Sequence, residues 1–274
     1  MAFSPLRVSF YLATSTALGA GAAAIAGHGL SRPVSAALLA GYAGLVALGV
    51  MSPRSRIFAD VIDRVPEGIA LTFDDGPHPE HTPRVLDLLD AHDAKATFFM
   101  IGRKMKAHPR VVEDVLKRGH AVGAHGFEHD RLFALRSYAW LEQDADREER
   151  VWHRIVGALP ALFRPPIGLV NPRIARVAAE RGRALVAWSF RARDGLASAR
   201  ADKVSERVVR RLKRGVVVLL HDSPERDGDR RVPAAIGALP AILDAAARLG
   251  LSPRTLPEPA ALPAREAPAE RDDS

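Results

Sequence analysis

Two kinds of hydrophobic pattern divide the chain. Residues 1–53 form long apolar stretches with only two formal charges, Arg7 and Arg32. From residue 54 onward, short apolar runs alternate with amphipathic segments, and every acidic residue lies at Asp60 or beyond. Long apolar stretches are typical of membrane helices, and the alternating pattern is typical of a folded α/β domain. The sequence therefore predicts a helical hairpin over 1–53, a folded domain over 54–256 and a disordered tail over 257–274.

The N-terminal part contains two uncharged runs, Val8–Ser31 with 24 residues and Pro33–Pro53 with 21. A helix needs about 20 apolar residues to cross the hydrocarbon core of a bilayer. Both runs are rich in Ala and Gly, and small residues let two helices pack closely in lipid. We therefore expect a transmembrane hairpin that contacts membrane lipid through residues 8–51 and makes this a two-pass protein of a bacterial-type cell membrane.

Two alternatives to the membrane hairpin stay open. The first alternative is a signal peptide, which has a cleavage site and an apolar region shorter than these two runs. Ala-Gly stretches over residues 17–27 provide such a cleavage site. A soluble hairpin is the second alternative, because alanine is only weakly hydrophobic. In a two-pass hairpin, Arg7, Arg54, Arg56 and Arg64 share one side, which favours the cytoplasm for the folded domain. These few arginines do not decide the side, nor does the sequence decide whether the N-terminus is cleaved.

Short β-branched or aromatic runs in the folded domain predict strands, and the amphipathic stretches between them predict helices. The expected strands are Ile69–Phe73, Ala96–Ile101, Ala121–Ala124, Leu185–Phe190 and Val216–Leu220. The expected helices are Pro83–Ala91, Pro109–Arg118, Tyr138–Val156, Pro172–Arg181, Asp202–Arg214 and Pro233–Leu249. This alternation indicates an α/β fold with parallel strands, either a (β/α) barrel or a doubly wound sheet. The first strand is not followed by G-x-G-x-x-G, which argues against a dinucleotide-binding fold.

Composition narrows the function classes further. The chain has 274 residues and no cysteine, which excludes disulfides, thiol nucleophiles and cysteine-ligated metals. Any zinc here would be held by histidine and carboxylate ligands. The formal net charge is +7, but no dense basic block with interleaved aromatic residues occurs. We therefore expect no nucleic-acid partner, and nothing in the sequence implies an obligate protein partner.

Polar residues follow each predicted strand, where the active sites of parallel α/β folds lie. Asp74 and Asp75 end the first strand, and two adjacent carboxylates after an apolar run suit a metal ligand beside a base. His125 and His129 follow the third strand, and their spacing predicts two ligands on one face of a helical turn. His221 ends the last strand and is a candidate general acid.

At this point the sequence resembles the polysaccharide deacetylases of carbohydrate esterase family 4, the NodB-homology domain, from about Ile69 to Leu256. Five segments carry the resemblance in chain order, namely Thr72–Pro77, His125–His129, Arg164–Ile167, the aspartate Asp194, and Leu219–His221. The chain departs from the family pattern at Gly126, which replaces Ser or Thr, at Ile167, which replaces Tyr, and at Gly195, which replaces Trp.

The resemblance implies a distorted (β/α)7-8 barrel of the NodB type and a metal-dependent N-deacetylase acting on amino sugars of a glycan. It implies a divalent metal, Zn²⁺ first with Co²⁺ or Ni²⁺ as alternatives, bound by Asp75, His125 and His129. The resemblance implies Asp74 as base, His221 as acid, Arg164 orienting Asp74, Asp194 supporting His221, and the backbone N–H of Ile167 as oxyanion donor. In addition, we expect Leu219 to line the pocket for the acetate methyl, and Trp188 with Phe190 to replace part of the missing aromatic walls.

Other readings of the same residues remain. The departures at Ile167 and Gly195 are also compatible with a carbohydrate-binding homologue that has lost catalysis. The apolar hairpin suits a deacetylase or deformylase of a lipid-linked sugar. His78, His81 and His92 do not have the spacing of a second metal site, so we expect surface residues.

Overall fold

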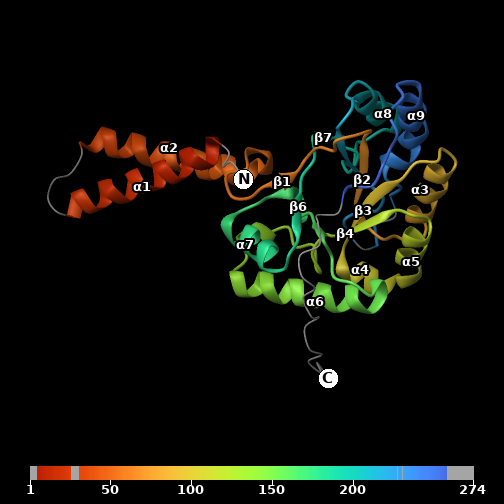
Figure 1. Cartoon of the computed structure of the whole chain (residues 1–274), viewed down its shortest axis with the longest axis horizontal. Helices are drawn as coiled ribbons and strands as arrows, with labels where there is room; N and C mark the ends of the chain where they lie inside the picture. Colours follow the sequence, from red (N-terminus) through yellow and green to blue (C-terminus); the bar gives the residue numbers. More distant parts are fainter. Residues whose placement is uncertain (1–4, 26–30, 227, 230, 258–274) are drawn as a thin grey trace.

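The computed structural model describes residues 5–25, 31–226, 228–229 and 231–257. Its centre is one eight-stranded sheet in which every ladder between neighbouring strands is parallel, in the order β1-β6-β5-β4-β3-β2-β8-β7 (Figure 1). The strands are β1 (Val61–Ile62), β2 (Ala70–Gly76), β3 (Ala96–Met100), β4 (Ala121–Ala124), β5 (Leu162–Phe163), β6 (Ala184–Val186), β7 (Phe190–Arg191) and β8 (Val217–His221). This curled half-barrel confirms the predicted NodB-type fold.

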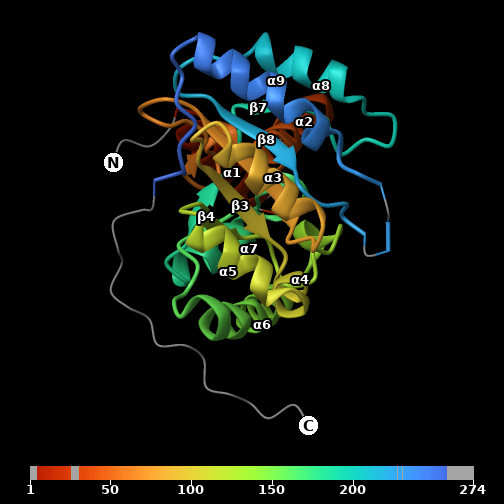
Figure 2. The ribbon, with the colours of Figure 1, turned by 90° about the vertical axis from the view of Figure 1, so that its right-hand side faces the viewer.

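In the described part of the folded domain, seven α-helices cover the outside of the sheet. They are α3 (His81–Asp90), α4 (Gly102–Ala107), α5 (Pro109–Lys117), α6 (Tyr138–Val156), α7 (Pro172–Glu180), α8 (Ala201–Val209) and α9 (Ala234–Arg248). Neighbouring helices touch in a row, with α8 against α9, α9 against α3, α3 against α5, and α4 and α7 against α6. The perpendicular view shows α8 and α9 at one end of this row and α6 at the other (Figure 2).

Alternation along β2 separates the core from the site. Leu71 and Phe73 belong to the large apolar cluster shared with the helices. The intervening Thr72 and Asp74 point to the opposite, inner face, because successive side chains of a strand alternate between faces. At one end of the inner face a second apolar cluster, which includes Phe99 and Val217, fills the half-barrel. The buried charges of Asp74 and Arg164 meet at the carboxyl end of β2.

The α-helices and strands predicted for the folded domain lie within three residues of the observed bounds, apart from five larger differences. The strands β1 and β5 and the helix α4 were not predicted, because two-residue strands and a six-residue helix carry no readable period. The prediction of a single strand over Leu185–Phe190 is wrong, because this segment is divided into β6 and β7. The division lies at Ser189, whose hydroxyl donates to Asp63 O and accepts from Val217 N–H. The helix expected to reach Arg214 ends at Val209, since the chain then turns at Gly215 (φ +85°) into β8.

The N-terminal part forms two helices, α1 (Pro5–Ile25) and α2 (Arg32–Met51), which lie side by side and project away from the sheet (Figure 1). Arg32, which separates the two uncharged runs and was expected in the turn of the hairpin, is instead the first residue of α2. Within the described residues, one helix, Pro33–Met51, is long and apolar enough to cross a membrane. The two-pass topology stays a prediction, and the expected tail lies outside the described residues from residue 258 on.

Candidate active site

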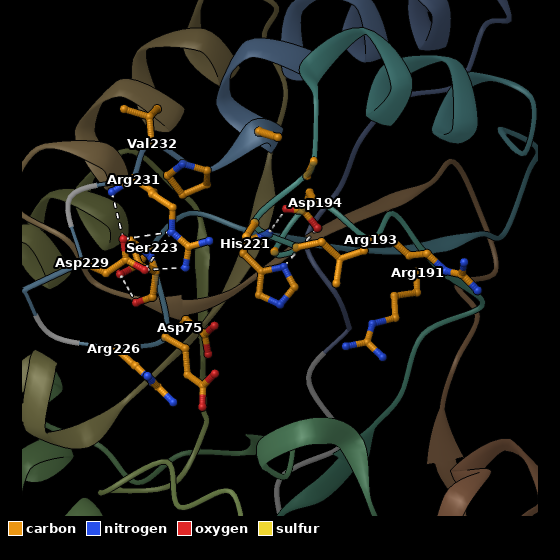
Figure 3. A pocket seen from close by; sticks show the side chains of 18 of the residues that line it. Asp75, Arg191, Arg193, Asp194, His221, Ser223, Arg226, Asp229, Arg231 and Val232 are labelled. Atoms are coloured by element: carbon orange, nitrogen blue, oxygen red, sulfur yellow. Dashed lines mark hydrogen bonds and ion pairs between the residues drawn. The ribbon is translucent and has the colours of Figure 1, made fainter.

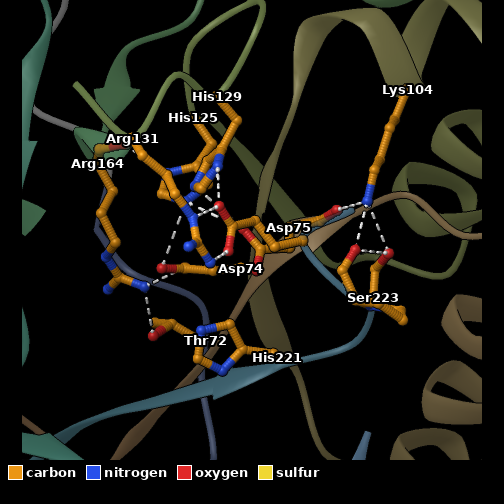
Figure 4. A network of polar contacts seen from close by, with 12 residues as sticks. Thr72, Asp74, Asp75, Lys104, His125, His129, Arg131, Arg164, His221 and Ser223 are labelled. Carbon is orange, nitrogen blue, oxygen red and sulfur yellow. Dashed lines mark hydrogen bonds and ion pairs between the residues drawn. The ribbon is translucent and has the colours of Figure 1, made fainter. Parts of the chain in front are cut away.

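The candidate site forms where β2 and β8 end side by side. The parallel register aligns Asp74 of β2 with His221 of β8. The chain after β4 adds His125 and His129, and the chain after β5 adds Arg164 (Figure 4). The structure therefore brings together residues that are up to 147 positions apart in the sequence.

Asp74 is paired with a fully buried arginine. Arg164 Nη1 donates to Asp74 Oδ1 at 2.5 Å and to Thr72 Oγ1 at 2.9 Å, while Nη2 donates to Ala187 O at 3.1 Å. The guanidinium also stacks over Phe99, 4.1 Å from the ring centroid. These contacts fix the direction of Arg164, so its charge holds Asp74 in one orientation.

Asp75, His125 and His129 form a candidate metal site. Asp75 Oδ1 lies 3.6 Å from His125 Nε2 and 3.3 Å from His129 Nε2. Ligands about 2.1 Å from a tetrahedral ion lie about 3.4 Å from one another, so this spacing fits a small divalent cation. His125 Nδ1 contacts Arg164 O at 2.6 Å, which fixes the ring and leaves Nε2 to face the site.

The two histidines lie on a loop, so the predicted helical turn is wrong. Gly126 (φ +79°) and His129 (φ +55°) both have left-handed backbone, which interrupts a helix. The carboxylate of Asp144 on α6 holds the loop by accepting from Phe127 N–H at 2.9 Å and from Glu128 N–H at 3.2 Å. Asp144 thus positions the histidines from outside the motif, and no pattern in the sequence marks this role.

Burial and charge shift the pKa values of the metal-site residues in different directions. Burial alone would raise the pKa of Asp75, but the hydrogen bond from His125 and the neighbouring histidines outweigh it and lower it. Burial likewise opposes the charge on His125, but Asp74 and Asp75 raise its pKa. For His129, burial together with the charge of His125 lowers the pKa to about 4. Asp75 is therefore anionic and His129 neutral at pH 7, the forms in which both bind metals.

His221 is held by Asp194 through two contacts. Asp194 Oδ2 accepts from His221 N–H at 2.7 Å, and Oδ1 lies 3.0 Å from His221 Nδ1. Burial disfavours the imidazolium, but the charge of Asp194 outweighs that penalty, and the pKa of His221 rises to about 10. The ring is thus protonated at neutral pH, with Nε2 left to act on a bound molecule.

The site opens into a cavity of about 310 Å³. Ile167, Leu219 and Trp188 line it together with the polar residues, as the resemblance implies. Gly195 lies next to His221, since a Cβ there would stand 3.4 Å from its Cε1. The absence of a side chain at Gly195 leaves this side of the site open to a larger cleft.

Backbone strain marks the site. Among the residues that the structure describes, six non-glycine residues have positive φ, and four of them lie here: Asp75, His129, Ile167 and Arg193. Left-handed backbone is unusual for such residues, and for β-branched Ile167 (φ +62°) it is a clear outlier. Strain of this kind clusters at functional sites, where the surrounding structure holds it.

Lys104 on α4 is a further buried residue that the sequence analysis missed. Its ammonium donates to Asp75 O at 2.8 Å, to Ser223 Oγ at 2.9 Å and to Pro224 O at 2.7 Å (Figure 4). It thereby ties the ends of β2 and β8 together. No signal near Lys104 in the sequence marks it, because its partners lie far away along the chain.

The other histidines do not form a second metal site in the described chain. His92 is exposed, as expected, but the expectation of a surface position is wrong for His81, which is buried. His81 stacks on His78 with ring centroids 3.9 Å apart at the start of α3, so packing against its neighbour explains its burial.

Comparison with known proteins agrees with this geometry. The profile of the family described as polysaccharide deacetylase matches residues 63–186. A peptidoglycan-N-acetylglucosamine deacetylase of Bacillus cereus is 41% identical over 175 residues, which cover 63% of this chain and 80% of that protein. A chitooligosaccharide deacetylase of Azorhizobium caulinodans is 36% identical over 155 residues, or 56% of this chain and 73% of that protein.

Solved structures agree as well. The crystal structure of a peptidoglycan N-acetylglucosamine deacetylase, in complex with an N-hydroxybenzamide compound, superposes with a TM-score of 0.66 at 29% identity, covering 71% of this chain and 90% of that one. The family profile, the relative that is 41% identical and the aligned fold together show that this chain belongs to the polysaccharide deacetylase family of carbohydrate esterases.

Proposed function

We propose that this protein is a metal-dependent hydrolase that removes N-acetyl groups from amino sugars of a glycan at the membrane. The observation that carries the proposal is the juxtaposition of the Asp75–His125–His129 cluster with the Arg164-bound Asp74 and the Asp194-bound His221 in one cavity. The relatives deacetylate peptidoglycan and chitooligosaccharides, which supports the same reaction here.

Asp75, His125 and His129 would hold the metal. One anionic oxygen and two imidazoles form the ligand set of hydrolytic zinc sites, so Zn²⁺ is the proposed ion, with Co²⁺ or Ni²⁺ as alternatives. When bound, the ion supplies Lewis-acid chemistry, which polarises an amide carbonyl and makes water more acidic.

Asp74 acts as the general base. Its Oδ1 is bound to Arg164, while Oδ2 lies 3.7 Å from His125 Nε2 and so faces the metal site. From there it takes a proton from the water that attacks the acetyl carbonyl carbon. Because Arg164 is buried and fixed by three acceptors, Asp74 needs no reorientation during the reaction.

His221 acts as the general acid. The raised pKa keeps its ring protonated, and Asp194 leaves Nε2 as the proton donor. When the C–N bond of the amide breaks, His221 transfers this proton to the departing nitrogen, because an amide nitrogen does not leave as an anion. The products are acetate and a free amino sugar.

Ile167, Leu219 and Trp188 shape the acyl pocket. Ile167 would offer its backbone N–H to the oxyanion, and its left-handed backbone beside the cavity supports this role. Loss of one such donor costs about 3–4 kcal/mol in a transition state. Leu219 packs against the acetate methyl, and Trp188 provides an aromatic wall in place of those absent at Ile167 and Gly195.

The apolar helices anchor this site to a membrane. Phe10 packs on Phe58 with ring centroids 5.2 Å apart, and Arg7 forms an ion pair with Asp60 at 3.1 Å. These contacts join the start of α1 to the folded domain and support a two-pass hairpin at a bacterial-type cell membrane. A reporter fused after Ser274, active in one compartment only, identifies the side.

The test is acetate release from N-acetylated chitooligosaccharides by the full chain in detergent. Activity should vanish on chelation, return with Zn²⁺, and be absent together with bound metal in His125→Ala. A chain that binds Zn²⁺ and releases no acetate from any N-acetylated sugar would instead be the carbohydrate-binding homologue. That reading has less support, because both the ligand set and the acid–base pair are complete.

A further inference from the structure

We propose that the cleft beside the candidate active site binds a phosphate or diphosphate group carried by the sugar substrate, through Arg191, Arg193 and Arg226. This inference rests on the proposed function, because it names the substrate class of the same site. It differs from the activity of a peptidoglycan or chitooligosaccharide deacetylase, for which no phosphate is needed.

The cleft is large and continuous with the catalytic cavity. It encloses about 870 Å³ and shares several lining residues with that cavity, among them Asp75, Arg191 and His221. Figure 3 shows Arg191 and Arg193 on one side of His221 and Arg226 on the other. A sugar held at His221 therefore has arginine side chains on both sides.

Five arginines line this cleft, and two of them are already neutralised. Arg131 forms two hydrogen bonds of 2.6 Å with the carboxylate of Glu225. Arg231 binds Asp229 through its Nε and Nη2 atoms. The half-buried carboxylates Glu225 and Asp229 are thus paired with these two arginines. The other two carboxylates of the cleft are Asp194, which binds His221, and Asp75, which belongs to the candidate metal site.

The other three arginines form no such pair, although the charge of Arg226 acts on Asp229 at longer range and helps to lower the pKa of that carboxyl. Within the described part of the chain, no side-chain hydrogen bond or ion pair is formed by Arg191, Arg193 or Arg226. Arg191 lies over Trp188, 5.9 Å from the ring centroid, which places its guanidinium at the passage between cleft and cavity. Arg193 has left-handed backbone (φ +59°), so its position is held against a conformational cost.

Three unpaired guanidiniums beside a sugar site indicate an anionic substrate. The planar guanidinium fork matches the oxygens of phosphate and forms charge-assisted hydrogen bonds with them. A dianionic phosphate or a diphosphate satisfies several arginines at once, whereas a neutral chitin-like chain offers them nothing. A single carboxylate carries only one charge for three cations, so phosphate fits the cleft better.

The helix α2 indicates where such a substrate is held. Val50 O at its end accepts from Val170 N–H at 3.2 Å, and Arg54 Nη1 donates to Ser189 O at 3.3 Å. These two contacts fall on the loops that carry Ile167 and Trp188, at the rim of the catalytic cavity. If α2 ends at the membrane surface, the site opens beside that surface, which favours a lipid-linked sugar phosphate over a soluble nucleotide sugar.

The experiment uses the full chain in detergent, loaded with Zn²⁺. Acetate release is measured from N-acetylglucosamine 1-phosphate and from the neutral methyl glycoside of N-acetylglucosamine. We expect kcat/KM to be at least tenfold higher for the phosphate compound, which corresponds to about 1.4 kcal/mol. Arg191→Gln with Arg193→Gln should bring the ratio of these two kcat/KM values close to one. The matched control, Arg110→Gln with Arg248→Gln, removes two exposed arginines outside the cleft and should keep it.

Calorimetric titration with N-acetylglucosamine 1-phosphate gives an answer that does not depend on turnover. Binding should weaken at least tenfold in the Arg191→Gln, Arg193→Gln variant and not in the control. The phosphate subsite is overturned if the kcat/KM ratio of the wild-type protein is near one, or if the Arg191→Gln, Arg193→Gln variant binds N-acetylglucosamine 1-phosphate as tightly as the wild type. In either case, acetate release from the neutral glycoside leaves the proposed function standing. Absence of acetate release from either compound, with retained binding, overturns the function and leaves the subsite.

Two further substrates separate the sources of phosphate. A short prenyl diphosphate-linked N-acetylglucosamine represents the lipid source, and the uridine diphosphate-linked sugar represents the soluble one. We expect a higher kcat/KM for the prenyl compound. A preference for N-acetylmuramic acid, which carries a carboxylate in place of phosphate, would contradict the assignment.

Discussion

The buried pair between Arg164 and Asp74 gives the most quantitative prediction. Arg164→Met removes the guanidinium and keeps most of the side-chain volume beside Phe99. Asp74 is only 4% exposed, so its carboxylate then stays buried without its cation. Removing one partner of a buried ion pair costs about 3–5 kcal/mol, and the lost hydrogen bonds to Thr72 and Ala187 are included in that range.

The free energy of unfolding should therefore fall by about 3–5 kcal/mol in Arg164→Met. Urea denaturation of the metal-free full chain in detergent, followed by circular dichroism, measures it. Arg176→Met is the matched control, because Arg176 is 67% exposed, forms its ion pair with Glu180 one helical turn away and otherwise lies over the Tyr138 ring at the surface. An exposed pair of this kind contributes about 0.3–0.5 kcal/mol.

A double-mutant cycle separates the ion pair from general packing. Asp74→Asn removes the negative charge, so adding it to Arg164→Met relieves the unpaired carboxylate. The loss in the double variant should be about 1–3 kcal/mol smaller than the sum of the two single losses. Additivity within about 0.5 kcal/mol would refute the reasoning, because the two residues would then stabilise the fold independently.

Three other substitutions test separate parts of the site. Asp194→Asn should move the alkaline limb of the kcat/KM–pH profile to lower pH, because without that carboxylate His221 loses its proton at a lower pH. An unmoved limb would contradict the role of His221 as the general acid. Lys104→Met should weaken metal binding about 10–100-fold, measured by competition with a chelator, because the backbone of Asp75 loses its support; unchanged affinity would show that the lysine is purely structural. Ile167→Gly should keep acetate release within about threefold and leave thermal stability unchanged or higher, because glycine adopts positive φ without strain; strong loss of activity would mean that the side chain itself contacts substrate.

The sequence predicted the elements that have a long enough pattern. β2 and β3 lie in short runs rich in apolar, β-branched and aromatic residues, and α6 was predicted with the observed bounds, because helix and strand patterns are readable over such lengths. β1 and β5 have two residues each, and their pairing depends on neighbours far along the chain. The same limit explains the division at Ser189, which is set by its bonds to Asp63 and Val217.

The candidate site was predictable where residues lie in motifs at strand ends. The structure brings Asp74, Asp75 and His221 together because parallel strands end at the same edge. The supporting residues were not predictable, since Lys104 and Asp144 act through backbone groups of other segments. A backbone contact leaves no residue pattern in the sequence.

The unpaired arginines show a similar limit. Arg191 and Arg193 looked like two of many arginines in a basic chain. Only the structure separates them from Arg131, whose charge is taken up by Glu225. The net charge of the chain therefore indicated no nucleic-acid partner, whereas the local charge of this cleft indicates an anionic substrate.

The most direct test of the central claim measures bound metal and acetate release on the same preparation of Asp74→Asn. Asp74 is proposed as the base and Asp75 as the ligand, so this variant should keep about one metal ion per chain. Its acetate release from an N-acetylated chitooligosaccharide should fall by about 10²–10⁴-fold, the usual contribution of a general base. Near-wild-type acetate release by Asp74→Asn would contradict the account.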